Sequence, residues 1–361
     1  MEKLLPNYHR CLTNISSSIL HRFGIDDHHT TINEIDQIIN NYKKVIFVFF
    51  DGMGSCILDK HLNENSFILQ NKICDLTSVF PPTTAAATTA LLSGKNPNET
   101  GWLGWHLYFK DIDEDLCLFS STGYYNLDYF NDGYTYTKLP YISIVDQIKN
   151  KGYLSLRIDS FNGYQDLNVF SDKIVQFANQ NSEGFLYAYY TEPDHLMHEF
   201  GVNDESVHQK ISAINNALEN IYQKIDNDTL VIVSADHGLV DVEPINLYYD
   251  EDIKNNLIVP PYCDARVNMF RVKDKEKFVR DFIHKYGGAF DLYSKEEVID
   301  KKLFGNMKNS EVFLELLGDF VAIGKDRYYL SYANNEDLIF KAHHSGYSKD
   351  EMMIPLILLH K

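Results

Sequence analysis

The chain has 361 residues, of which 44% are hydrophobic, 23% charged and 13% aromatic. Such a composition supports a large buried core and excludes a disordered or collagen-like polymer. Asp and Glu number 51 against 33 Lys and Arg, which gives a formal net charge of -18. This charge disfavours a nucleic-acid polymer or a polybasic membrane anchor as a partner, although a small anion can still bind beside a metal ion.

The cysteines and the N-terminal sequence indicate in which cellular compartment we expect the protein. Five cysteines lie far apart without a Cys-x-x-Cys pair, and an odd number in so long a chain does not indicate a disulfide framework. The N-terminus lacks a basic region followed by a long apolar one, and the longest apolar runs, 45–50 and 354–359, are too short to span a bilayer. We therefore expect a cytoplasmic protein with no membrane partner, and the sequence leaves its oligomeric state open.

Helical and strand-like patterns alternate along the chain. Isoleucines at helical spacing predict a helix over 32–42, and the run over 45–50 predicts a strand buried on both faces. The next helix begins after Pro81-Pro82, and Gly94 suits its C-terminal cap. The alternation continues with helices around 144–148, 174–177 and 211–225 and with strands at 153–158, 185–190 and 229–234. It predicts an α/β fold built on a mostly parallel sheet.

Two stretches interrupt this alternation. Residues 111–138 are polar and rich in tyrosine, and residues 246–335 carry a new strand-like run, RVNMFRV, followed by a charged helix over 274–286. We predict one composite catalytic core, formed by residues 1–245 and 336–361. Residues 246–335 are then an inserted cap subdomain, and 111–138 form a smaller cap loop.

Acids and histidines follow the predicted strands, where ligands bind in parallel sheets. The candidates are Asp51, Asp194, His198, Asp236, His237 and, before the last apolar run, His344. Each has an ordinary alternative explanation, such as a turn or a solvated surface pair. Their joint occurrence at one end of the sheet favours metal binding, because Asp and His suit zinc or another divalent ion and six ligands divide between two ions about 4 Å apart.

A nucleophilic hydroxyl is expected near these metals. Thr83 and Thr84 lie at the predicted N-terminus of the helix after Pro81-Pro82. There, free backbone N–H groups and the helix dipole favour an anion or an attacking alkoxide. Simple capping of the helix by threonine is the alternative.

Five motifs resemble, in their order, those of the alkaline phosphatase superfamily. They are VFFDGMG, VFPPTTAAATTALLSGKNPNETGWLGW, YTEPDHLMHEFG, VSADHG and HHSGYSKDEMMIPLIL, and they span most of the chain. The likeness is to the type I phosphodiesterase/nucleotide pyrophosphatase branch in particular. It implies a three-layer αβα sandwich with a mostly parallel central sheet and a small inserted cap.

The resemblance also implies roles for individual residues. One divalent ion would be held by Asp51, Asp236, His237 and the nucleophile Thr84. The second would be held by Asp194, His198 and His344, with His343 as the alternative to His344. Zinc is the preferred metal and manganese the second choice.

The implied activity is metal-dependent hydrolysis of phosphodiester or pyrophosphate bonds in a small-molecule ester, through a covalent intermediate on Thr84. Where the family's nucleotide pyrophosphatases carry a phosphate-binding asparagine, this chain has Trp105. Trp105 or His106 is therefore a candidate substrate contact, and an aromatic plug under the cap is the alternative. A phosphomonoesterase, a phosphonoacetate-type phosphonate hydrolase and an inactive metal-binding relative remain open.

Overall fold

The computed structural model describes residues 1–160, 166–334 and 340–361, and its central sheet has six strands in the order β2-β17-β8-β1-β7-β6. These are β1 (Lys44–Phe50), β2 (Lys72–Thr77), β6 (Leu154–Asp159), β7 (Gly184–Tyr190), β8 (Thr229–Ala235) and β17 (Met353–Leu359). The strands β8, β1, β7 and β6 run parallel, whereas β17 is antiparallel to both of its neighbours. The prediction of a mostly parallel central sheet is confirmed.

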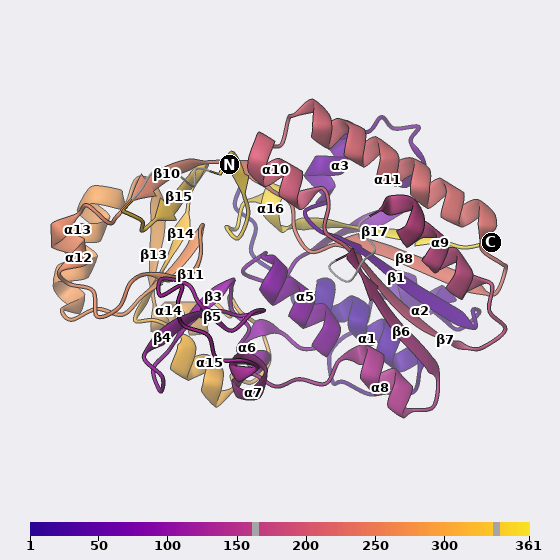
Figure 1. The fold of residues 1–361 in the computed structure, drawn as a ribbon, viewed down its shortest axis with the longest axis horizontal. Coiled ribbons are helices and arrows are strands. Elements are labelled where there is room, and N and C mark those ends of the chain that lie inside the picture. The colour runs from indigo at the N-terminus through magenta and orange to yellow at the C-terminus, as the bar shows by residue number, and fades with distance from the viewer. Residues whose placement is uncertain (161–165, 335–339) are drawn as a thin grey trace.

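Helices cover both faces of this sheet (Figure 1). One layer contains α1 (Leu12–Arg22), α2 (Asn33–Ile39), α5 (Thr84–Ser93) and α8 (Ile144–Asn150). The other contains α3 (Ser55–His61), α4 (Phe67–Asn71), α9 (Leu167–Ala178) and α11 (Glu205–Lys224). Because both faces are covered, every residue of β1, β7 and β8 is buried. This is the expected three-layer αβα sandwich.

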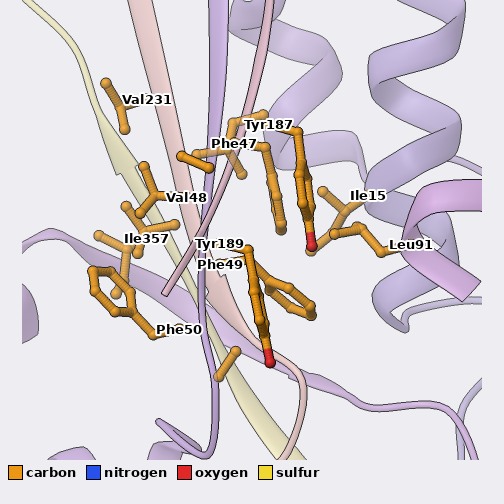
Figure 2. Packing of buried hydrophobic residues seen from close by; sticks show 14 of the residues in the cluster. Ile15, Phe47, Val48, Phe49, Phe50, Leu91, Tyr187, Tyr189, Val231 and Ile357 are labelled. Atoms are coloured by element: carbon orange, nitrogen blue, oxygen red, sulfur yellow. The ribbon is translucent and has the colours of Figure 1, made fainter. Parts of the chain in front are cut away.

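The core forms where β1 and β7 meet the layer of α1 and α5. The rings of Phe47 and Tyr187 lie nearly parallel, with centroids 6.4 Å apart and an interplanar angle of 11°. Ile15 of α1 and Leu91 of α5 lie on the same side of the sheet as these rings (Figure 2). The hydroxyl of Ser16 donates to the Leu91 carbonyl at 2.6 Å, which ties the two helices together.

The expected elements largely occur where the periodicity places them. Gly94 caps α5 in the left-handed conformation, at φ 69°. The charged helix expected over 274–286 is α13 (Lys275–Tyr286). The helix expected over 32–42 is shorter, because it ends at Ile39 and is followed by Asn40 and Asn41, and asparagine side chains compete for backbone hydrogen bonds at helix ends.

A second sheet has seven antiparallel strands in the order β13-β14-β12-β11-β3-β4-β5. These strands are β3 (His106–Phe109), β4 (Glu114–Cys117), β5 (Thr122–Gly123), β11 (Tyr262–Asp264), β12 (Val267–Phe270), β13 (Phe290–Ser294) and β14 (Phe320–Gly324). Its hydrophobic cluster includes Phe80 and Ala85, at the start of α5, together with Trp102. The second sheet therefore packs against the N-terminus of α5.

The two interrupting stretches of the sequence meet in this second sheet. The pairing of Cys263 in β11 with His106 in β3 joins the part from 106–123 to the part from 262–324. β3 itself lies in the segment that sequence analysis assigns to the core. The division into core and cap remains a prediction, and its boundary at residues 335 and 336 lies outside the described residues.

All five cysteines, which lie within the described residues, carry free thiols. In the described parts of the chain, we find no helix with the length and apolar character required to cross a bilayer.

The substitution Leu91→Ala tests the packing between α1 and α5. It removes a buried side chain from this layer, and we expect the free energy of unfolding to fall by about 2–5 kcal/mol. Urea denaturation followed by circular dichroism measures the change. Leu127→Ala is the control, because the Leu127 side chain is 84% exposed and its loss should cost less than about 0.5 kcal/mol. Equal effects of the two substitutions would contradict the assignment of Leu91 to the core.

Candidate active site

The carboxyl ends of three parallel strands place the predicted acids at one edge of the sheet. β1 ends in register with both β7 and β8. Asp51 and Asp236 directly follow β1 and β8, and Asp194 begins α10 (Asp194–Phe200) shortly after β7. The backbone N–H of Asp194 donates to the Asp51 carbonyl at 3.1 Å. The loops that follow β1 and β7 are thus held side by side.

The first group of candidate ligands surrounds Thr84. Ligand atoms of Asp51, Asp236 and His237 lie within 4.8 Å of one another. The Thr84 hydroxyl oxygen lies 3.5 Å from Asp51 Oδ1 and 3.4 Å from His237 Nε2. Thr84 is the first residue of α5, and Thr83 is its N-cap. The hydroxyl therefore lies both beside the acids and at the positive end of the helix dipole.

The second group of candidate ligands consists of Asp194, His198 and His344. His198 Nε2 is 3.2 Å from Asp194 Oδ2, and His344 Nε2 is 4.0 Å from Asp194 Oδ1. The His237 and His344 rings stack with centroids 3.8 Å apart, so the two groups adjoin. His343 is also near, with its ring 4.6 Å from that of His198. The structure brings together all of the predicted ligands, and their assignment to metals remains a prediction.

Three histidines are oriented in the same way. The Nδ1–H groups of His198, His237 and His344 donate to backbone carbonyls, at 2.8 Å to Ala342, 3.2 Å to Gly238 and 3.1 Å to Pro82. Each therefore presents Nε2 toward the carboxylates, as metal-binding histidines do. His343 Nδ1 lies 2.9 Å from the backbone nitrogen of His344 and 3.1 Å from its carbonyl oxygen, so these two contacts do not assign its hydrogen. The choice of His344 over His343 as the ligand remains a prediction.

Burial makes the ionised forms of Asp51 and Asp236 unfavourable. Burial, together with neighbouring Asp236 and Asp194, raises the pKa of Asp51 well above its usual range. Burial likewise raises the pKa of Asp236. Among the described residues, Asp194 Oδ1 and Asp236 Oδ2 are buried carboxylate oxygens without a hydrogen-bond donor. Unpaired carboxylate oxygens beside imidazole nitrogens are a donor set that suits divalent cations such as zinc.

Burial also prepares the His344 side chain for a cation. Burial, with His237 adjacent, lowers the pKa of His344 well below its usual value. The ring is therefore neutral at pH 7, and neutral imidazole is the form that binds metal.

A buried ion pair supports the loop that carries His344. Arg266 Nε donates to Glu351 Oε1 at 2.7 Å, and both side chains are fully buried. The same carboxylate accepts the backbone N–H of Gly346 at 2.7 Å and the Ser348 hydroxyl at 2.6 Å. The backbone of Arg266 also donates to the hydroxyl of Ser345, which has a positive φ of 86°. These bonds fix the backbone on the C-terminal side of His344.

The second sheet contributes one further acid. Asp264 of β11 accepts the Thr83 hydroxyl at 2.6 Å, and its Oδ1 lies 4.0 Å from His343 Nδ1. The Thr83 side chain makes no capping hydrogen bond to α5. Its hydroxyl therefore links the start of the helix to the second sheet, which differs from the simple capping role that the sequence allowed.

The two candidate substrate contacts have different surroundings. Trp105 is 43% exposed, and its ring packs edge-on against Phe119 with centroids 5.9 Å apart. His106 is buried, and its Nδ1 lies 2.8 Å from Asp115 Oδ1. Their contact with a substrate remains a prediction.

Sequence analysis missed several contributors to the site. Tyr189 donates a hydrogen bond to Asp51 Oδ2, but in sequence it is only one aromatic residue of an apolar strand. Asp264 and Arg266 lie in the region predicted as a cap, far along the chain from their partners. Of these residues, Glu351 alone lies within one of the five motifs, so the sequence pattern could have pointed to it.

The substitution Arg266→Met tests the buried ion pair. It leaves the Glu351 carboxylate buried without its cation, so we expect a loss of about 3–5 kcal/mol in the free energy of unfolding. Adding Glu351→Gln to Arg266→Met should recover part of this loss, since it removes the uncompensated charge. Urea denaturation measures both, and Arg280→Met is the control because that side chain is 69% exposed. A loss no larger than that of the control would contradict a supporting role for the pair.

Sequence comparisons identify the family and two classes of relative. Residues 121–348, more than half of the chain, match the family described as type I phosphodiesterase / nucleotide pyrophosphatase. A GPI ethanolamine phosphate transferase 2 from Kluyveromyces lactis is 29% identical over 133 residues, which are 37% of this chain and 16% of that protein. The catalytic subunit of GPI ethanolamine phosphate transferase 3 from Mus musculus is 27% identical over 84 residues, 22% and 8% of the two chains. The matched part of this chain thus spans less than a fifth of either relative.

Solved structures share the fold over most of the chain. Murine ectonucleotide pyrophosphatase / phosphodiesterase 5 superposes with a TM-score of 0.66 at 18% identity and covers 88% of each chain. Phosphonoacetate hydrolase from Sinorhizobium meliloti 1021, in complex with phosphonoformate, also has a TM-score of 0.66, at 14% identity, over 89% of this chain and 91% of that one. The solved structures show the shared fold, and the family match over more than half of the chain shows that it belongs to the type I phosphodiesterase / nucleotide pyrophosphatase family of the alkaline phosphatase superfamily.

Proposed function

We propose that this chain hydrolyses phosphodiester or pyrophosphate bonds in a small-molecule substrate, through a covalent intermediate on Thr84. The observation that carries the proposal is the position of the Thr84 hydroxyl. It lies 3.5 Å from Asp51 Oδ1 and 3.4 Å from His237 Nε2, at the N-terminus of α5. A hydroxyl in contact with metal-type ligands, at a helix end that attracts anions, is suited to attack phosphorus.

Two divalent ions complete the proposed site, with zinc preferred over manganese. Asp51, Thr84, Asp236 and His237 would hold one of them. Asp194, His198 and His344 would hold the other. When bound, such ions lower the pKa of a coordinated hydroxyl and neutralise charge that develops on the phosphoryl oxygens.

The chain's own residues perform the displacement in two steps. After the Thr84 hydroxyl has lost its proton, the alkoxide oxygen forms a bond to phosphorus while the bond to the leaving oxygen breaks. Water then attacks the same phosphorus and releases Thr84. Backbone N–H groups in the first turn of α5 have no partners within the helix, so they are available to phosphoryl oxygens during both steps.

The charge around the site supports a diester over a monoester. A phosphate monoester is a dianion, and Arg and Lys side chains are common partners of such phosphates in proteins. Arg266 is the basic residue that hydrogen bonds bring to the His344 loop, but its guanidinium is fully buried and paired with Glu351. It is therefore occupied in supporting the loop and is not free to bind a phosphate.

The cap belongs to the same proposal. We assign residues 246–335, with the loop 111–138, to a cap over the core of residues 1–245 and 336–361. The bond from Thr83 to Asp264 supports this assignment, because it connects the second sheet directly to the residue before the nucleophile. A cytoplasmic location, expected from the cysteines, remains a prediction.

Metal binding gives the first test. We expect metal-stripped protein to gain thermal stability when zinc or manganese is added, because a ligand that binds only the folded state stabilises it. Metal analysis should then find two ions per chain. His344→Ala should lose one of them, and His343→Ala, as the matched control, should keep both. Loss of an ion from the His343 variant alone would reverse the assignment.

Hydrolysis gives the second test. Metal-loaded protein should release p-nitrophenol from bis(p-nitrophenyl) phosphate faster than from p-nitrophenyl phosphate. Thr84→Ala should lower kcat on the diester at least about a thousandfold, since it removes the nucleophile. Thr89→Ala, in the same helix, should remain active. A preference for the monoester would indicate a phosphatase, and inactivity toward both esters a phosphonate hydrolase or an inactive relative.

A further inference from the structure

A buried Asp–His pair lies in the second sheet beside the start of α5. His106 of β3 and Asp115 of β4 are diagonal neighbours, because His106 pairs with Cys117 and Tyr108 pairs with Asp115. His106 Nδ1 lies 2.8 Å from Asp115 Oδ1, and the two side chains are only 7% and 8% exposed. A carboxylate can only accept here, so Nδ1 carries the hydrogen and Nε2 is the nitrogen left to exchange a proton.

Tyrosines hold the imidazole in one orientation. The ring of Tyr124 stacks on His106 with centroids 3.6 Å apart and an interplanar angle of 6°. Tyr125 packs edge-on against Tyr124 at 4.9 Å, and its hydroxyl donates to the Pro261 carbonyl at 2.7 Å. With Asp115 at one edge of the ring and Tyr124 on its face, the direction of Nε2 is fixed before a substrate binds.

His106 lies one strand away from Asp264, the residue whose carboxylate binds Thr83. The strand partner of His106 is Cys263, and the next residue, Asp264, accepts the hydroxyl of Thr83 at 2.6 Å. The loop before His106 is held tightly to β11, because a Cβ on Gly104 would lie 2.5 Å from the Cys263 carbonyl oxygen. Burial raises the pKa of Asp264, and the hydrogen bond from Thr83 is the largest effect that opposes this rise. Thr84 directly follows Thr83.

We propose that His106, oriented by Asp115, is the general acid that protonates the leaving group. The inference rests on the proposed function and deepens it. In the first step the Thr84 alkoxide forms the bond to phosphorus, the bond to the leaving oxygen breaks, and Nε2 transfers its proton to that oxygen, which departs as an alcohol. In the second step neutral His106 takes a proton from the attacking water, and Thr84 departs from phosphorus as the alkoxide. Both protonation states are thereby restored.

This role predicts the class of leaving group. An alkoxide of an ordinary alcohol leaves poorly unless it is protonated, whereas a nitrophenolate leaves readily without a proton. We therefore expect His106 to accelerate the hydrolysis of esters of alcohols and weakly acidic phenols. The predicted substrate is a diester whose leaving group is a poor one.

The test compares aryl methyl phosphate diesters that differ only in the leaving group, from p-nitrophenol to unsubstituted phenol. His106→Gln in the metal-loaded protein should lower kcat/KM about a hundredfold or more on the phenyl ester. On the p-nitrophenyl ester, His106→Gln should lower kcat/KM less than about threefold. Asp115→Asn should show the same pattern with a smaller effect, because it removes the group that orients His106. Tyr108→Phe in the same strand is the control and should lower neither value.

Uniform effects would overturn the inference. If His106→Gln lowers kcat/KM by the same factor on every ester, or on none, His106 does not protonate the leaving group. Thr84-dependent turnover by the unmodified protein would then leave the proposed function standing. If the unmodified protein shows no Thr84-dependent turnover of any diester, both the general acid and the proposed function fall.

Discussion

The buried carboxylates at the end of the central sheet are the constraint on which the rest of the structure depends. Asp51, Asp194 and Asp236 follow parallel strands and lie close together, and burial together with the other two carboxylates raises the pKa of Asp51. Two of their oxygens have no donor among the described residues. Such an arrangement is unfavourable without compensating positive charge. The neighbouring imidazoles and the dipole of α5 are arranged around this requirement.

The surrounding backbone holds the compensating groups in place. Backbone carbonyls fix the ring orientation of His198, His237 and His344. The buried pair of Arg266 and Glu351 supports the loop after His344. A rigid surrounding is useful here, because catalysis by position and charge tolerates little displacement of the reacting atoms.

Several site residues could be predicted from the sequence because they directly follow predicted strands. Asp51 and Asp236 are adjacent in sequence to the strands that carry them, so finding the strand also locates the acid. Parallel strands then bring these ends together whatever the rest of the chain does. The supporting residues lacked this local signal. Asp264 reaches Thr83 from 181 positions away, and Tyr189 reaches Asp51 from 138.

The sequence by itself determined the α/β class, the parallel strands, the cap of α5 at Gly94 and the set of candidate ligands. These follow from local periodicity and from short motifs, whose geometry depends on a few neighbouring residues. Only the tertiary structure decided that β3 joins the two interrupting stretches into a single sheet. It also placed Asp264 on Thr83, Asp115 on His106 and Arg266 on Glu351. Contacts between strands and side chains far apart in sequence depend on how whole layers pack, and no local pattern encodes that packing.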